Sequence, residues 1–329
     1  MEYRKLGKSG LRVSEVCFGT MTFGNQNWGC DEDVSRSILD RALDAGVNFI
    51  DTADIYASGA SEEIIGRWMK GKRDQVVIAT KVFFPTGPGP NDRGAGRVHV
   101  RRAIEESLRR LGTDHVDLYQ IHCWDARTPI EETLSVFTDL VREGKIRYFG
   151  CSNFAAWHIE KAVRVAEREH LEQFVSLQPQ YSLVMRDIER EILPVCREEG
   201  LGIIPWSPLG SGFLAGKLDR ASKPPTGTRL ASWEDTAARH MTPRNFDLLD
   251  LLRAIGGEHD RPVAAVALRW LLQVPGVTSP IIGARTLVQL DQNLACADWA
   301  LPEDAWKRID EASRVPEGYP YQFIRNMSG

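Results

Sequence analysis

The chain has 329 residues, of which 43% are hydrophobic and 26% charged, with a formal net charge of −4. This composition is typical of a soluble globular protein, and no apolar run approaches the roughly 18 residues that a membrane span requires. The small negative charge and the lack of a basic block argue against nucleic acid as the main partner. Six cysteines without paired spacing, and an amino terminus without a secretory signal, predict a cytoplasmic protein with reduced thiols.

The chain begins with a predicted hairpin and continues as a regular alternation of strands and helices. A Gly-Lys-Ser-Gly turn at residues 7–10 separates two short runs within residues 3–13, which is typical of a β-hairpin. Strand-like runs then alternate with segments whose apolar residues recur every three or four positions, the period of a helix. The eight runs are residues 15–19, 47–51, 75–81, 116–121, 146–151, 174–177, 202–206 and 279–282.

Those eight strand-helix units predict the fold class. The runs are apolar on both faces, and such strands pair in parallel beneath covering helices. Eight units of this kind close naturally into a barrel. We therefore expect a single α/β domain over residues 1–329, a (β/α)8 TIM barrel with an N-terminal β-hairpin and extra helices and loops at the face formed by the carboxyl ends of the strands.

Some segments fall outside this repeat. Residues 83–96 and 209–244 follow the third and seventh strands and are predicted to lie at the carboxyl-end face, where substrate and cofactor contacts are expected. A closing helix is predicted at residues 303–313. The tail at residues 315–329 could either cover a pocket or pack on the surface.

Four ionisable residues stand at or just after strand ends. Asp51 ends the second strand and is followed by Tyr56, while Lys81 ends the third strand and His122 the fourth. Each alone has a plain structural explanation, such as a helix cap or a solvated lysine, but the four together face one mouth where parallel α/β proteins bind ligands. An acid beside a lysine keeps the ammonium charged, and an ammonium beside a phenol lowers the phenol pKa from about 10. A phenol with a lowered pKa is suited to act as a general acid near neutral pH.

Later strand ends carry groups suited to a planar amide and an aromatic ring. Ser152, Asn153 and Gln178 offer a hydroxyl and two carboxamides that could hold an amide such as nicotinamide, although Ser-Asn is also an ordinary turn. Trp206 offers an indole face for stacking and Ser207 a hydroxyl for phosphate, with a plain core role for the tryptophan as the alternative.

Two further motifs concern phosphate. Residues 210–215 fit the dinucleotide fingerprint Gly-x-Gly-x-x-Gly/Ala, but no second strand ending in an acid follows, so we reject a Rossmann unit. After a strand that ends at Gly283, Thr286 and Gln289 form a predicted capping box, and Arg285 beside this helix start makes an anion site. The seven histidines lack metal-ligand spacing, so no metal is expected.

These motifs together resemble the aldo-keto reductase superfamily over nearly the whole chain. They are Phe-Ile-Asp-Thr-Ala-Asp-Ile-Tyr at 49–56, Ala-Thr-Lys at 79–81, Asp-Leu-Tyr-Gln-Ile-His at 117–122, Gly-Lys-Ile-Arg-Tyr-Phe-Gly-Cys-Ser-Asn at 144–153, Trp-Ser-Pro-Leu at 206–209 and the segment 283–293. The resemblance, to a bacterial-type branch near the potassium-channel β-subunit-like members, implies a (β/α)8 barrel that binds NADPH in an extended pose. It places the family's catalytic tetrad on Asp51, Tyr56, Lys81 and His122.

The same resemblance implies cofactor contacts along the chain. They fall on Thr20, Met21, Asp51, Ser152, Asn153, Gln178 and Trp206 at the nicotinamide end, on Ser207, Leu209, Gly212 and Lys217 at the pyrophosphate, and on Gly283, Arg285, Gln289, Gln292 and Asn293 at the adenosine end. Many members carry a basic residue where Gly283 and Gln289 stand here. Arg285 is then the chief candidate for the 2′-phosphate, and NADPH is expected in preference to NADH.

The implied reaction is reduction of an aldehyde or ketone by hydride transfer from NADPH. Tyr56 would protonate the developing alkoxide, and His122 would orient the carbonyl. The expected substrate contacts are Trp28, Tyr56, Phe83, His122 and Trp124, and Phe84 is also expected to line the mouth. Their aromatic character indicates an apolar or aromatic carbonyl compound and leaves sugar, nucleotide-sugar and pyridoxal-like substrates open. The sequence also leaves open whether the protein forms a homo-oligomer.

Two other function classes remain at this point. Potassium-channel β subunits resemble this fold and act mainly as cofactor-sensing partner proteins, but they carry Asn where His122 stands, which favours an enzyme here. A barrel hydrolase or aldolase could use Lys81 as a Schiff-base amine, but the neighbouring Asp51 would hold that lysine charged and non-nucleophilic.

Overall fold

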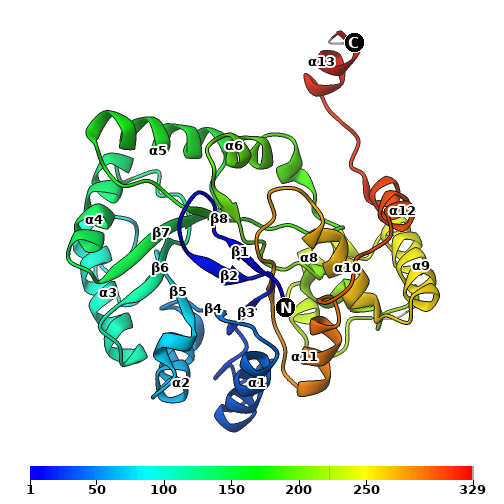
Figure 1. Ribbon diagram of the computed structural model, residues 1–329, viewed down its shortest axis with the longest axis horizontal. Helices are drawn as coiled ribbons and strands as arrows, with labels where there is room; N and C mark the ends of the chain where they lie inside the picture. The colour runs from blue at the N-terminus through cyan, green and yellow to red at the C-terminus, as the bar shows by residue number, and fades with distance from the viewer. Residues whose placement is uncertain (222, 328–329) are drawn as a thin grey trace.

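The computed structural model describes residues 1–221 and 223–327, and a ring of parallel strands forms its centre (Figure 1). Eight strands pair in the order β10-β3-β4-β5-β6-β7-β8-β9. Their bounds are β3 Cys17–Gly19, β4 Phe49–Asp51, β5 Val77–Val82, β6 Val116–Ile121, β7 Ile146–Ser152, β8 Ser176–Gln178, β9 Gly202–Ile203 and β10 Ile281–Ile282. Each lies within or next to a predicted run, so the expected barrel strands are confirmed.

The two end strands of this sheet approach each other and close the barrel. Ile203 in β9 bridges Val277, and its carbonyl accepts a 2.7 Å hydrogen bond from the Thr278 amide. The Ile281 amide of β10 donates to the Pro205 carbonyl at 2.8 Å. Both end strands are shorter than predicted because Pro205 and Pro280 have no amide proton to donate to a ladder.

Helices surround the strands on the outside (Figure 1). They are α1 Glu32–Asp44, α2 Ala60–Trp68, α3 Arg97–Leu111, α4 Ile130–Arg142, α5 Ala156–Glu169, α6 Ile192–Glu198, α7 Arg229–Ser232, α8 Glu234–His240, α9 Pro243–Glu258, α10 Val263–Leu272, α11 Leu287–Leu294, α12 Glu303–Ser313 and α13 Tyr321–Met327, with short 3-10 turns at Tyr56–Gly59, Arg73–Gln75, Asp187–Glu189 and Gly210–Ala215. Their apolar stripes face the strands, as where Phe137 of α4 stacks on Tyr119 of β6 at 5.2 Å between ring centroids.

The predicted hairpin closes one end of the barrel. Strands β1 Tyr3–Lys5 and β2 Arg12–Ser14 pair antiparallel, and Leu6 and Val13 pack against barrel-lining side chains such as Phe49 and Leu118. Because this end is filled, the opposite end, where the strands have their carboxyl termini, is left to bind ligands.

The long insertion and the tail have more structure than a loop. Residues 209–244 contain α7 and α8, and α12 matches the predicted closing helix. The tail then leaves the barrel, and α13 stands apart from it (Figure 1) with exposed Phe323 and Met327. Among the tail residues that the structure describes, none lines the cavity described below. Within the described parts of the chain, no helix is long and apolar enough to cross a membrane.

Candidate active site

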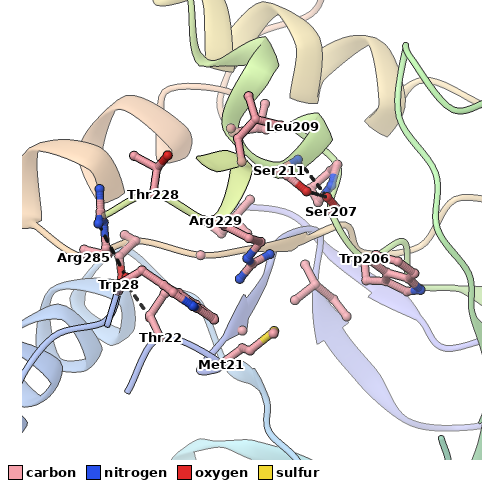
Figure 2. A pocket seen from close by; sticks show the side chains of 18 of the residues that line it. Met21, Thr22, Trp28, Trp206, Ser207, Leu209, Ser211, Thr228, Arg229 and Arg285 are labelled. Carbon is pink, nitrogen blue, oxygen red and sulfur yellow. Dashed lines mark hydrogen bonds between the residues drawn. The ribbon is translucent and has the colours of Figure 1, made fainter. Parts of the chain in front are cut away.

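A cavity of about 720 Å³ opens at the carboxyl ends of the strands. Figure 2 shows that its walls come from the loops after β3, β9 and β10 and from the insertion that carries α7. The predicted site residues that line it are Met21, Trp28, Asp51, Tyr56, His122, Ser152, Asn153, Gln178, Trp206, Ser207, Leu209, Gly212, Lys217, Gly283, Arg285, Gln289, Gln292 and Asn293. Thr20, Lys81, Phe83 and Trp124 are not among the lining residues.

Lys81 stands at the centre of the predicted tetrad. Its Nζ donates to Asp51 Oδ1 at 2.6 Å, to the Thr52 carbonyl at 2.7 Å and to the Tyr56 hydroxyl at 3.2 Å. Adjacent parallel strands β4 and β5 bring these groups together, because Asp51 pairs with Ala79, two residues before Lys81. The structure therefore places a charged lysine between a carboxylate and a phenol, while the chemical roles of these residues stay predictions.

Two glutamines, one of them not predicted as a site residue, hold the second oxygen of Asp51. Gln120 Nε2 donates to Asp51 Oδ2 at 3.1 Å, and Gln178 Nε2 donates to the same oxygen at 2.9 Å. The Gln178 amide thus points partly toward the acid, whereas the sequence assigned it to a nicotinamide carboxamide. Gln120 lies inside the Asp-Leu-Tyr-Gln-Ile-His motif, two positions before His122, so it shares that residue's inward face.

Burial and charge act in opposite directions on the phenol. The Tyr56 side chain is half-buried at the cavity wall, and this loss of hydration raises the pKa of its hydroxyl more than the nearby Lys81 ammonium lowers it. The expectation of a lowered phenol pKa is therefore wrong in net direction, because it left out burial. Burial lowers the pKa of Lys81, but Asp51 and Tyr56 together outweigh this effect and bring that pKa to about 12. Tyr56 is protonated and Lys81 charged across the neutral range.

His122 faces Tyr56 across the cavity floor. The two rings lie edge to face with centroids 6.1 Å apart, and Phe84 also packs edge to face on the imidazole, with centroids 4.9 Å apart. Burial lowers the pKa of His122 well below its usual value, with the Lys81 charge adding to the effect. The ring is therefore neutral, with one nitrogen free to donate a hydrogen bond.

A tight turn holds the phenol in place. After Tyr56, Ala57 and Ser58 adopt φ values of 47° and 55°, which are uncommon for residues with side chains. Gly59 follows with φ 94°, and a Cβ there would lie 2.7 Å from the Arg110 side chain. Backbone strain of this kind costs of order 1–3 kcal/mol per residue and persists where the surroundings enforce it.

The expected nicotinamide end forms a connected group of polar side chains. Asn153 Nδ2 donates to the His122 carbonyl at 2.9 Å and to Ser152 Oγ at 3.0 Å. Its Oδ1 accepts from Trp206 Nε1 at 3.2 Å, which fixes the indole at the cavity wall (Figure 2). Thr20 lies behind this surface, where its hydroxyl donates to the Asp51 carbonyl at 3.1 Å.

The expected phosphate region is a turn of main chain. Ser207 and Ser211 both have positive φ, and the Ser207 hydroxyl accepts a 2.9 Å hydrogen bond from the Ser211 amide. Gly212 has φ 96°, a Cβ added there would meet nothing within 4 Å, and Lys217 lines the same cavity. Small residues in this conformation let a ligand approach the backbone.

The helix start at Thr286 differs in one detail from the predicted capping box. Thr286 Oγ1 accepts from the Gln289 amide at 3.2 Å, as expected, but Gln289 Oε1 accepts from the Arg285 amide instead of the Thr286 amide. Arg285 Nη1 donates to the Gly227 carbonyl at 2.7 Å, which ties this helix start to the segment 223–233, called the strap below.

A second arginine in the cavity was not predicted. Arg229 of the strap lies in the middle of the lining, between Arg285 and Trp206 (Figure 2). Its guanidinium stacks over Trp28 at 5.1 Å and Trp233 at 5.5 Å from the ring centroids, and no hydrogen bond or ion pair joins it to the described residues. Burial lowers the pKa of this guanidinium below its usual value. A half-buried cation without an anion facing a cavity is a binding group for a negative ligand.

The aromatic residues at the mouth divide into two groups. Trp28 and Phe84 line the cavity, as expected for the mouth. Trp124 stacks on His158 at 4.0 Å, and Phe83 packs edge to face on Phe84 at 5.4 Å. The substrate roles expected for Phe83 and Trp124 stay predictions, and Phe84 is a further candidate. Residues 1–221 and 223–327 contain no group of three His, Cys, Asp or Glu side chains that could hold a metal ion.

Comparison with known proteins gives the family. The Aldo/keto reductase family model matches residues 15–314. The uncharacterized oxidoreductase YrpG of Bacillus subtilis (strain 168) is 41% identical over 338 residues, covering 98% of this chain and 100% of that protein.

Two further relatives are of different kinds. A probable voltage-gated potassium channel subunit beta of Oryza sativa subsp. japonica is 36% identical over 326 residues, 97% of this chain and 98% of that protein. The aryl-alcohol dehydrogenase GME11368 of Pestalotiopsis microspora is 34% identical over 332 residues, 96% of this chain and 83% of that protein. With the barrel and these matches over nearly its whole length, the chain belongs to the aldo/keto reductase family of oxidoreductases.

Proposed function

We propose that this protein reduces an aldehyde or ketone to an alcohol, with NADPH as the hydride donor and Tyr56 as the general acid. The observation that carries the proposal is the position of Lys81 Nζ, 2.6 Å from Asp51 Oδ1 and 3.2 Å from the Tyr56 hydroxyl. A phenol beside a fixed ammonium, at the wall of a cavity, is suited to give a proton to an alkoxide. The similarity to an aryl-alcohol dehydrogenase and to an oxidoreductase supports this chemistry.

The cavity suits an extended nicotinamide dinucleotide. Trp206 offers an indole face at one end, and Arg285 lies at the other (Figure 2). Arg229, which has no anionic partner among the described residues, lies between them, where the pyrophosphate of an extended dinucleotide would carry its charge, and Lys217 adds a second cation. We therefore assign Arg229 to the pyrophosphate and Arg285 to the adenosine end, with its 2′-phosphate. When bound, the reduced nicotinamide supplies the hydride.

The protein's own groups would then handle the substrate oxygen. The neutral His122 donates a hydrogen bond to the carbonyl oxygen and orients it. As negative charge develops on that oxygen, the Tyr56 hydroxyl transfers its proton there, and the resulting phenolate is stabilised by the Lys81 ammonium 3.2 Å away. Asp51, held by Gln120 and Gln178, keeps that ammonium in place.

An absorbance assay with the purified protein tests the proposal. NADPH should be consumed in the presence of aromatic and aliphatic aldehydes, and Tyr56→Phe should lower kcat by about 10² to 10⁴, the usual contribution of a general acid. Tyr319→Phe, which changes an 87% exposed tyrosine of the tail, is the matched control. Tryptophan fluorescence should show that Tyr56→Phe still binds NADPH. Full activity in Tyr56→Phe, or no consumption by the wild type with any carbonyl compound, would refute the proposal.

The potassium-channel relatives favour one other function, a partner protein that senses its cofactor. This alternative requires NADPH binding without turnover, so the same assay separates the two. A Schiff-base role for Lys81 fits less well, because this lysine is fully buried and its pKa is raised to about 12, which keeps the amine protonated.

A further inference from the structure

Two buried carboxyl groups, those of Asp54 and Glu62, flank the Tyr56 turn in the sequence. Glu62 of α2 accepts from Thr80 Oγ1 at 2.5 Å and from Arg110 Nε at 2.7 Å. Asp54, in the segment between β4 and the turn, is 3% exposed, and neither of its carboxyl oxygens has a hydrogen-bond partner of normal geometry among the described residues. One of the two acids is therefore satisfied and the other is not.

Among the described residues, the cations near Asp54 are already paired with other acids. Arg110 of α3 is paired with Glu62, and Lys81 of β5 is paired with Asp51. Tyr119 of β6 is fully buried nearby, and its hydroxyl also lacks a partner within the described part of the chain. An ionised carboxylate in such a place is costly unless it is paired. Burial, followed by the Glu62 charge, raises the pKa of Asp54 to about 7.

The backbone around Asp54 connects it to the phenol. The Asp54 amide donates to the Lys81 carbonyl at 3.3 Å, and the Tyr56 amide donates to the Ala53 carbonyl at 3.1 Å. Asp54 thus lies in the short segment that joins the β4 acid to the strained turn after Tyr56. Arg110, the partner of the other acid, packs beside Gly59 at the end of that turn.

We propose that Asp54 is a positioning residue that works in its protonated form. As a neutral acid it lets residues 53–55 pack against the barrel and hold Tyr56 in place. After it loses its proton, the carboxylate competes with Glu62 for Arg110 and with Asp51 for Lys81, and this displaces Tyr56 from Lys81. The reductase would therefore lose activity as the pH rises above neutrality. The kinetic part rests on the proposed function, whereas the effect on folding does not.

The free energy of unfolding should also depend on the protonation of Asp54. The pKa of the Asp54 carboxyl is about 7 in the folded protein, whereas in the unfolded chain it has the ordinary value of 3.8. Between pH 3.8 and pH 7 the folded state therefore binds more protons than the unfolded state. The contribution of Asp54 to the free energy of unfolding is therefore largest below pH 4 and is lost as the pH rises to about 7. Replacement by asparagine, a neutral isostere of the protonated acid, should remove this dependence.

Asp54→Asn tests both parts. Wild-type kcat should fall about tenfold as the pH rises through about 7. This fall corresponds to a change of roughly 1.4 kcal/mol in the free energy that favours the active conformation, and the variant should lack it. Urea unfolding at pH 5 and pH 8 should show that the stability of the variant relative to the wild type is greater at pH 8 than at pH 5, because the contribution of Asp54 is only partly lost at pH 5. Asp44→Asn, which changes an exposed acid at the end of α1, is the matched control and should keep the wild-type pH dependence.

Each outcome decides the proposal. The proposal would be overturned if the fall in kcat near pH 7 persisted in Asp54→Asn. It would also be overturned if the stability of the variant relative to the wild type were the same at pH 5 and pH 8. If the protein turns over no NADPH at any pH, the proposed function fails, while the unfolding measurement still tests Asp54. If Asp54→Asn does not fold, Glu62→Gln replaces it: removing the Glu62 charge should lower the pKa of Asp54 and move both transitions below pH 7, and transitions that stay in place would contradict the inference.

Discussion

The two ends of the cavity are built differently. At the acid-base end, Asp51 and Lys81 stand on adjacent barrel strands, are 2% and 0% exposed, and already satisfy each other. At the phosphate end, the groups come from the insertion and the strap, and Arg229 has no anionic partner among the residues that the structure describes. The first region is complete before a ligand arrives, whereas the second has charge that a ligand must neutralise. Changes in the first region should therefore alter the rate, and changes in the second should alter nucleotide affinity.

The largest effect is expected at Lys81. Lys81→Met leaves the Asp51 charge buried with Gln120 and Gln178 as its remaining side-chain donors in the described part of the chain, and breaking a buried pair costs about 3–5 kcal/mol of stability. It also removes the ammonium beside Tyr56, so kcat should fall at least as far as in Tyr56→Phe. Activity and urea unfolding measure the two effects, and Lys70→Met, at an exposed position, is the control. A folded variant with wild-type kcat would show that the lysine is only structural.

A smaller effect is expected at the opposite end. Arg229→Ala should weaken NADPH and NADH binding alike, by about ten- to a hundredfold, because hydrogen bonds to charged groups contribute about 1.5–3 kcal/mol. Fluorescence titration gives the dissociation constants, and Arg36→Ala on the exposed side of α1 is the control. Unchanged nucleotide affinity with a raised KM for the carbonyl compound would instead assign Arg229 to the substrate.

Arg285 should act on cofactor choice. Arg285→Ala removes the candidate partner of the 2′-phosphate, so the ratio of NADPH to NADH affinity should fall about tenfold. The same change frees the Gly227 carbonyl of the strap, but that loss affects both nucleotides and cancels in the ratio. A ratio equal to that of the wild type would move the 2′-phosphate site elsewhere.

The smallest effect is expected at Trp233. Its ring supports the Arg229 guanidinium at 5.5 Å, and a cation–π contact of this kind contributes about 0.5–1 kcal/mol. Trp233→Ala should weaken NADPH binding two- to fivefold with kcat unchanged, whereas Trp157→Ala, at a 61% exposed position, should have no effect on binding. A loss as large as that of Arg229→Ala would mean that Trp233 contacts the ligand itself.

The same division explains how much the sequence could predict. Asp51, Lys81 and His122 end regular strands, so strand periodicity alone brings them to one mouth, and the resemblance added their roles. The direction of the Tyr56 pKa could not be predicted, because it depends on how deeply the ring is buried. Arg229 lies in an insertion without strand or helix periodicity, and its place in the cavity depends on the Arg285 contact to Gly227. Residues placed by long-range contacts of an irregular segment leave no pattern in the sequence.

The short closing strands β9 and β10 have a consequence for local opening. The strands β9 and β10 form no ladder with each other, and the seam between them is closed by an isolated bridge and by a few main-chain hydrogen bonds of Ile203 and Pro205 to residues 276–281. Trp206 and Gly283 follow these two strands and stand on opposite sides of the seam, so a dinucleotide lying across both would link its two edges. Amide hydrogen exchange at Ile203, Thr278 and Ile281 should therefore slow on nucleotide binding more than exchange in β5 or β6.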